Sequence, residues 1–180
     1  LLNSTIRLES LIPFLQHQQA TSVAITNKRL YGVLPFYQMV KKAGLHPVIG
    51  LTCRIEISEE HNADVQVYAK SNIGYQNLLK ISSALEVKAL SALPIKWLQA
   101  YKQDCLVVVS MLKQSSLEAK VSILDELKNS LGSDLLGGVE RPGGIVDSQE
   151  NEFINLCEER QIRLMATHQA KYVSAKDAFA

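Results

Sequence analysis

The sequence lacks any apolar run of about 18 residues, the length at which a segment becomes a candidate membrane-spanning helix. Its first residues do not form a charged, cleavable leader. The chain opens with Leu1 rather than a methionine, and we therefore expect the natural chain to start further upstream. Together these absences predict a cytoplasmic protein with no membrane partner.

The chain also lacks an excess of either charge. Its 19 basic and 18 acidic residues give a formal net charge of +1. A strong overall positive field would attract the phosphate backbone of nucleic acid, and this balance supplies none. We therefore do not expect this domain to contact DNA alone.

Cysteine is scarce as well. The three cysteines, Cys53, Cys105 and Cys157, are far apart, and none belongs to a Cys-x-x-Cys pair. This spacing argues against a disulfide framework or a zinc site and predicts reduced, buried thiols. No repeat, linker or low-complexity tract divides the 180 residues, of which 47% are hydrophobic. We therefore predict one domain over residues 1–180 with a sizeable core.

Two common catalytic motifs are missing. Ser110 and His168 could be members of a hydrolase triad, but no Gly-x-Ser-x-Gly elbow surrounds the serine. The glycine pairs Gly137-Gly138 and Gly143-Gly144 could suggest a phosphate-binding loop. They lack the Gly-Lys-Ser/Thr ending of that loop, and two tight turns explain them better.

The sequence does contain a regular alternation of strands and amphipathic helices. Strands are predicted over residues 23–26, 46–57, 65–69, 105–110, 135–139 and 163–167. Helices are predicted over residues 6–15, 34–42, 71–83, 94–101, 115–131 and 147–160, with another beginning at 174. This βα rhythm is typical of a parallel barrel or a doubly wound sheet.

Several helix ends carry specific signals. Pro35 fits the first turn of its helix, and Gly44 and Gly132 fit the positions just past helix ends. Asp147 or Ser148 is expected to cap the helix that follows. Asn3 or Ser4 could cap the first helix, in which Pro13 predicts a kink or a late start.

The helix over residues 71–83 has a capping candidate and an apolar face. Ser71 or Asn72 can cap its first turn. The side chains expected to face the core are Ile73, Leu78, Leu79 and Ile81. The strands over 46–57 and 65–69 flank a polar turn, so they could pair as a hairpin or lie as neighbours in the sheet.

Polar residues follow the predicted strands. In parallel α/β folds the carboxyl ends of the strands carry the chemistry. The residues at these points are Thr26, Asn27, Lys28, Thr52, Ser110, Glu140, Arg141, His168, Gln169 and Lys171. We therefore predict that any active site is assembled from these loops.

Three motifs resemble one family. A strand, Thr26-Asn27-Lys28, a spacer and Leu30-Tyr31-Gly32 resemble a motif with Thr-Asp-His and Leu-Tyr-Gly. Ala69–Leu78 resembles Ala-Lys-Asn-x-x-Gly-Tyr-x-Asn-Leu, and Ala166–Tyr172 resembles Ala-Thr-Asn-Asp-x-His-Tyr. The family is the polymerase-and-histidinol-phosphatase (PHP) domain of bacterial DNA polymerase III alpha subunits. Together with Ala69–Leu78 and the Lys80-Ile81-Ser82-Ser83 that continues it, Gly50-Leu51-Thr52 is most similar to the low-GC Gram-positive branch of the family.

The resemblance implies a distorted (β/α) TIM-like barrel that lacks its first strand here, the strand that carries a His-x-His motif in the family. The polymerase palm, fingers and thumb would lie beyond residue 180, with Mg²⁺ in the palm. Implied partners are the remainder of the polymerase chain, a proofreading exonuclease and other replisome subunits. Contact with DNA would be made through the full-length protein.

The chain departs from the family at its metal-binding positions. The positions of this degenerate metal site are Asn27, Lys28, Thr52, Glu140, His168, Gln169 and Lys171. A neutral amide and a donor-only ammonium cannot replace a carboxylate and an imidazole around a divalent cation. We therefore expect no catalytic residue, no metal and no cofactor in this domain. The lysines could instead replace the metal charge by pairing with Glu140 or another acid.

Two alternatives remain open. One is a metal-dependent phosphoesterase or 3′-5′ exonuclease whose site is completed by the strand upstream. The other is a non-enzymatic binding module, which predicts an exposed apolar patch.

Overall fold

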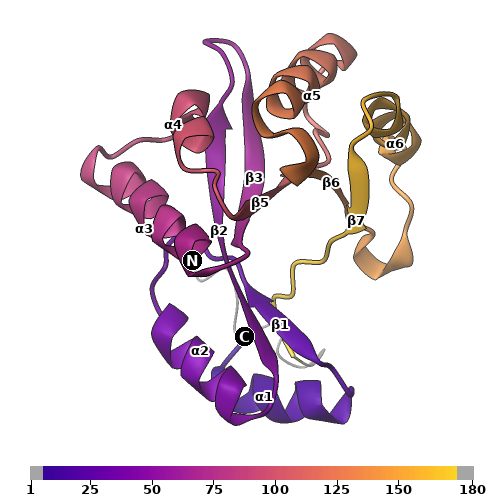
Figure 1. Cartoon of the computed structure of the whole chain (residues 1–180). Helices are drawn as coiled ribbons and strands as arrows, with labels where there is room; N and C mark the ends of the chain where they lie inside the picture. The colour runs from indigo at the N-terminus through magenta and orange to yellow at the C-terminus, as the bar shows by residue number, and fades with distance from the viewer. Residues whose placement is uncertain (1–5, 174–180) are drawn as a thin grey trace.

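The computed structural model describes residues 6–173 and shows a curled sheet with helices on its outside (Figure 1). The helices are α1 Leu8–His17, α2 Val33–Lys42, α3 Asn72–Val87, α4 Ile95–Ala100, α5 Leu117–Leu131 and α6 Glu150–Glu159. The strands are β1 Ser22–Ile25, β2 His46–Glu56, β3 Asn62–Ala69, β4 Leu93–Pro94, β5 Cys105–Ser110, β6 Leu135–Val139 and β7 Arg163–Ala166. Two short 3₁₀ helices are η1 Gly132–Asp134 and η2 Pro142–Gly144.

The sheet is mixed and forms a curled half-barrel. Its order is β1-β2-β3-β5-β6-β7, and β4 adds to β2. β1 pairs parallel with β2, and β5, β6 and β7 form a parallel run. β3 is antiparallel to both of its neighbours, so the predicted pairing of β2 with β3 is confirmed as a hairpin. The α/β barrel class predicted from the sequence is thus confirmed, with one reversed strand.

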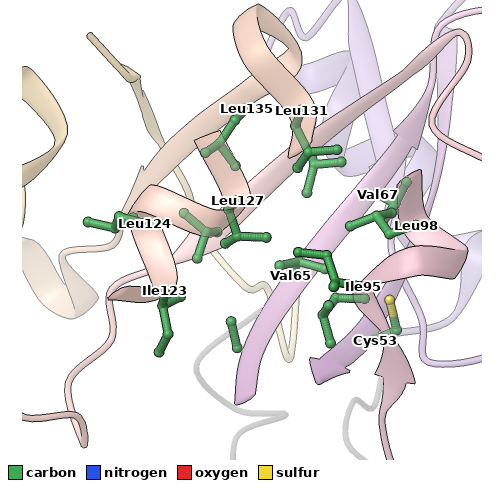
Figure 2. Close-up of a cluster of buried hydrophobic side chains, with 14 of the residues drawn as sticks. Cys53, Val65, Val67, Ile95, Leu98, Ile123, Leu124, Leu127, Leu131 and Leu135 are labelled. Atoms are coloured by element: carbon green, nitrogen blue, oxygen red, sulfur yellow. The ribbon is translucent and has the colours of Figure 1, made fainter. Parts of the chain in front are cut away.

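The molecule has two hydrophobic cores. The main core lies between the helices and the strands β2 to β6, and Figure 2 shows Leu124, Leu127 and Leu131 of α5 beside Val65 and Val67 of β3. A second, small core is formed by α1, β1, α2 and the first half of β2, which together we call the N-terminal lobe. Its buried residues are Phe36, Val40 and Leu45.

Most helix boundaries agree with the predictions. Gly44 has a φ of 78°, the left-handed conformation that glycine adopts after a helix end. Pro35 lies in the first turn of α2. The Ser71 hydroxyl accepts hydrogen bonds from the amides of Ile73 and Gly74, so its capping role is confirmed. Pro13 lies inside α1.

Two predictions about the faces and ends of helices are wrong. Ile73 and Leu79 are 47% and 44% exposed, although both were expected to face the core. The buried stripe of α3 instead includes Gly74 and Asn77. Gly74 packs so closely against the Asp104 carbonyl that an added Cβ would lie 2.1 Å from its oxygen. The close backbone approach at Gly74 therefore sets the rotation of this helix.

The start of α6 also differs from the prediction. α6 begins at Glu150, and Gln149 is its N-cap residue without a side-chain cap. Asp147 instead accepts a hydrogen bond from the Gln149 amide at 2.9 Å. The expected caps Asn3 and Ser4, and the helix expected from residue 174, lie outside the described residues.

The cysteine prediction is confirmed. Cys53, Cys105 and Cys157 are free and buried. Burial raises the pKa of the Cys53 thiol to about 12 and those of the Cys105 and Cys157 thiols to about 11. These thiols are therefore packing groups rather than nucleophiles. None of the helices within residues 6–173 is long and apolar enough to cross a membrane.

Candidate functional site

The end of β1 and the middle of β2 bring together one group of the predicted positions. Asn27 and Lys28 are exposed immediately after β1. The Thr52 amide donates to the Asn27 carbonyl at 3.1 Å, and the Thr52 hydroxyl donates to the Thr26 carbonyl at 2.5 Å. The structure therefore joins Thr52 to this loop through main-chain acceptors.

The ends of β6 and β7 bring together the other group. The Thr167 amide donates to the Val139 carbonyl at 2.8 Å, which extends the pairing of the two strands. The Gln169 amide donates to the Glu140 carboxylate at 3.1 Å. The Glu140 carboxylate thus contacts the main chain of the loop after β7.

An open hollow of about 560 Å³ lies beside this second group. Arg141, Thr167 and His168 supply its polar lining, and Ile154, Leu164 and Met165 supply much of the rest. His168 and Gln169 are exposed. The two groups belong to opposite ends of the strand order, and the curled sheet turns the segment after β7 back toward β1 (Figure 1).

The side chains at these positions do not fit a multinuclear metal centre. Among the described residues, no group of three or more His, Cys, Asp or Glu could hold a metal ion. Glu140 and His168 are the carboxylate and the imidazole that remain, and they stand beside amides and ammonium groups. Clusters of hard divalent cations require several oxygen or imidazole ligands. Within residues 6–173, the donor set at these strand ends therefore does not match what such a cluster requires.

The lysine hypothesis receives no support at Lys28. Within residues 6–173, Lys28 forms no salt bridge. The pairing of Lys171 with an acid remains a prediction.

Ion pairs hold the segment between β6 and α6, and the sequence analysis did not find them. The Arg141 Nε atom lies 3.0 Å from both carboxylate oxygens of Glu150, and its Nη2 atom also contacts Oε1. Glu150 is only 1% exposed. The hydrogen bonds from Arg141 hold the pKa of the Glu150 carboxyl below its ordinary value.

Two more ion pairs join neighbouring loops. The Lys113 ammonium lies 2.8 Å from Asp147, and hydrogen bonding from Lys113 lowers the pKa of that carboxyl. The buried Lys120 ammonium lies 2.6 Å from Glu152 and donates to Gln149 at 3.0 Å. We call these two pairs, together with Arg141–Glu150, the loop clamp. It ties the segments after β5 and β6 to the start of α6.

The sequence did contain a signal for two members of the loop clamp. Lys120 precedes Ile123 and Leu124 at helical spacing, so it lies on the buried stripe of α5. Glu150 precedes Phe153 and Cys157 in the same way on α6. A charged residue on an apolar stripe requires a partner, because burial of a lone charge is costly.

Comparison with known proteins places the chain among described families. Residues 1–140 match the family described as PHP domain. DNA polymerase III subunit alpha of Halalkalibacterium halodurans is 32% identical over 145 residues, which cover 74% of this chain and 13% of that protein. The Bacillus subtilis DNA polymerase III subunit alpha is 30% identical over 188 residues, covering 98% of this chain and 17% of that protein. The chain thus spans less than a fifth of these relatives.

A solved structure supports the same assignment of the fold. An amidohydrolase from Chromobacterium violaceum, with bound sulfate and no metal, superposes with a TM-score of 0.63 at 8% identity. The match covers 97% of this chain and 85% of that one, so the half-barrel is shared almost throughout. The residues that suggested the family, Thr26 to Gly32 and Ala69 to Leu78, lie within the matched region. This chain therefore belongs to the PHP domain family.

Proposed function

We propose that this chain is the N-terminal PHP domain of a replicative DNA polymerase III alpha subunit and that the domain is metal-free and structural. It would extend over residues 1–180 and support DNA-directed DNA synthesis in the cytoplasm. Nucleotide addition, and the Mg²⁺ that it uses, would belong to a palm region outside this chain. The two relatives named above, at 30% and 32% identity, support this parentage.

The donor chemistry of the strand ends carries the proposal. Asn27, Lys28, Gln169 and Lys171 stand where the family resemblance implies Asp and His ligands. The remaining carboxylate, Glu140, already accepts the Gln169 amide. Phosphoester hydrolysis by a metal cluster requires ions that polarise the phosphate and activate water. Ammonium groups at these positions would repel such ions.

The loop clamp supports a structural role for the same region. Its three ion pairs connect the segments after β5 and β6 to α6 with side chains of this chain alone. These contacts among the chain's own side chains support a structural role for the loops.

The proposed partners are the remainder of the polymerase chain, a proofreading exonuclease and other replisome subunits. Ile145 and Val146 are 73% and 56% exposed in the segment that the loop clamp holds, and Leu164 of β7 is 39% exposed. Apolar side chains on a held loop are suited to packing against another protein surface. These exposed side chains support a docking role for the segment.

Metal analysis and a phosphodiesterase assay on the full-length protein test the proposal. We expect less than one equivalent of zinc or manganese per chain, and no hydrolysis of bis-p-nitrophenyl phosphate above background with added Mn²⁺. Glu140→Gln should leave DNA synthesis unchanged. Two or more bound ions, with hydrolysis that is lost in Glu140→Gln, would instead establish the metal-dependent phosphoesterase.

A further inference from the structure

The small net charge of the chain conceals a strong separation of charge. Residues 1–103 contain eleven basic and six acidic residues, whereas residues 104–180 contain eight basic and twelve acidic residues. The two parts therefore carry formal charges of +5 and −4. No Asp or Glu occurs between Glu9 and Glu56, a segment that forms most of the N-terminal lobe. Such asymmetry within a chain indicates a surface for an anionic partner.

The structure gathers several of these cations beside exposed aromatic rings. Leu34, Tyr37 and Lys41 are three and four residues apart on α2, so they form one stripe along the helix. Tyr31 lies in the loop just before α2, and Lys28 and Arg29 precede it. We call these six residues the aromatic stripe.

The aromatic stripe is not part of a core. The buried face of α2 consists of Val33, Phe36 and Val40. Tyr31 is 71% exposed and Tyr37 is 43% exposed. Both rings therefore offer faces to which a planar group can bind.

An exposed ion pair joins the loop of the aromatic stripe to α3. The Arg29 Nε atom lies 2.8 Å from Glu86 of α3, and its guanidinium lies 5.9 Å from the Tyr31 ring centroid. An open hollow of about 310 Å³ lies between this loop and the exposed Leu79 of α3. Arg29 and Glu86 also line it, with Leu30, Tyr31, Ser82 and Ser83. The hollow is therefore largely apolar, with the Arg29–Glu86 ion pair at its edge.

Lys28 and Lys41 remain available for an anion. Neither forms a salt bridge with a residue in the part of the chain that the structure describes. Glu86, which lines the hollow beside this loop, is paired with Arg29. An anionic ligand would therefore meet little opposing charge.

We propose that the aromatic stripe binds single-stranded DNA. Surfaces of this kind combine cations that contact phosphates with aromatic rings on which bases stack. Lys28 and Lys41 supply the cations, and Tyr31 and Tyr37 supply the rings. An acidic protein segment would use the cations but has no need of two exposed rings. The choice of DNA as the ligand rests on the proposed function. The binding itself does not depend on whether the candidate site at the strand ends is free of metal.

Fluorescence anisotropy with labelled dT15 and the 180-residue chain tests this inference. We expect binding that weakens about sevenfold between 50 and 200 mM salt, as two phosphate contacts to a single strand predict. Lys28→Glu combined with Lys41→Glu should abolish binding at 200 mM salt. Tyr31→Ala should weaken it at least about fivefold, the lower range for loss of one stacked base, without changing the salt dependence.

Two matched variants test whether binding requires the aromatic stripe or only exposed lysine and tyrosine side chains in general. Lys96→Glu removes another exposed lysine, and Tyr172→Ala removes another exposed tyrosine. Both should bind dT15 as the unmodified chain does, and circular dichroism should show that all variants are folded. Equal binding of duplex DNA or polyglutamate, together with normal binding by Tyr31→Ala, would overturn the proposal. Tenfold tighter binding of rU15 would overturn the choice of DNA. None of these results depends on the metal analysis, so the two proposals can fail separately.

Discussion

The N-terminal lobe and the rest of the molecule are stabilised in different ways. The lobe has three buried core residues and no acidic residue between Glu9 and Glu56. The main body has a large apolar core and is ordered at its strand ends by the loop clamp. Ile49 of β2 packs against both cores. One continuous strand, β2, thus joins a small basic lobe to a larger acidic body. We therefore expect the lobe and the main body to lose stability under different conditions.

The largest effect is expected from Phe36→Ala in the N-terminal lobe. Phe36 is 2% exposed and is the largest side chain of the small core. Truncation of a buried phenylalanine costs about 3–5 kcal/mol. Hydrogen exchange should show loss of protection in α2 and β1, while β3 and β5 keep theirs. Equal loss in β3 and β5 would show that the lobe and the main body unfold as one unit.

Acid should destabilise the main body before the lobe. Arg141 lowers the pKa of Glu150, and Lys113 lowers that of Asp147. A carboxyl whose folded pKa lies below its unfolded value adds stability above the unfolded value, and this stability is lost as the pH falls through the folded pKa. The loss should therefore begin as the pH falls toward the ordinary values, near 4.5 for Glu and 3.8 for Asp.

Urea titrations between pH 3 and pH 7 measure this effect through Trp97, which packs against the main core. Glu150→Gln should flatten the acid limb of the stability curve. If the stability of Glu150→Gln depended on pH as that of the unmodified chain does, the Arg141–Glu150 pair would contribute nothing to the acid destabilisation. Hydrogen exchange at low pH should again separate the two regions, with α2 protected longer than α6.

A smaller effect is expected from Thr52→Val, which tests the junction of the two regions. The substitution keeps the shape of the side chain but removes the hydroxyl that donates to the Thr26 carbonyl. Loss of such a hydrogen bond costs about 0.5–1.5 kcal/mol. Thermal unfolding should report this decrease, and Thr52→Ser, which keeps the hydroxyl, is the control. A neutral Thr52→Val would mean that water replaces the contact without cost.

The smallest effect is expected from Arg54→Ala on the hairpin. The Arg54 and Asp64 side chains lie 2.9 Å apart but are both 56% exposed. Exposed ion pairs contribute about 0–1 kcal/mol. Denaturation by urea should therefore place this variant within that range of the unmodified chain. A loss of stability above about 2 kcal/mol would contradict the expectation that exposed ion pairs matter less than buried ones.

Much of the fold could be predicted because its elements follow simple periodicities. β5 is a continuous apolar run, and α5 combines an apolar stripe with a serine cap and a following glycine. The rotation of α3 could not be predicted, since the contact of Gly74 with the Asp104 carbonyl joins residues 30 positions apart. For the same reason the sequence did not show that Lys120 contacts Glu152.

The candidate site was predicted in part. The strand-end rule placed Asn27, Lys28, Glu140, His168 and Gln169 in loops that follow strands, because this rule depends on topology alone. Their role as a degenerate metal site stays a prediction. The contact between Glu140 and the Gln169 amide required coordinates. The separation of basic and acidic regions was present in the sequence. It was missed because the opposite charges of the two regions nearly cancel in the total of +1.

The close packing at Gly50 has a mechanical consequence. Gly50 is where β2 leaves β1 and begins to pair with β3. An added Cβ there would lie 2.9 Å from the Tyr68 ring and 3.0 Å from the Thr26 methyl group. The Gly50 backbone is thus closely surrounded by the Tyr68 ring, the Thr26 methyl group and the Val67 carbonyl. A larger residue here would have to displace Tyr68 or Thr26, and it would thereby change how the lobe meets the main body.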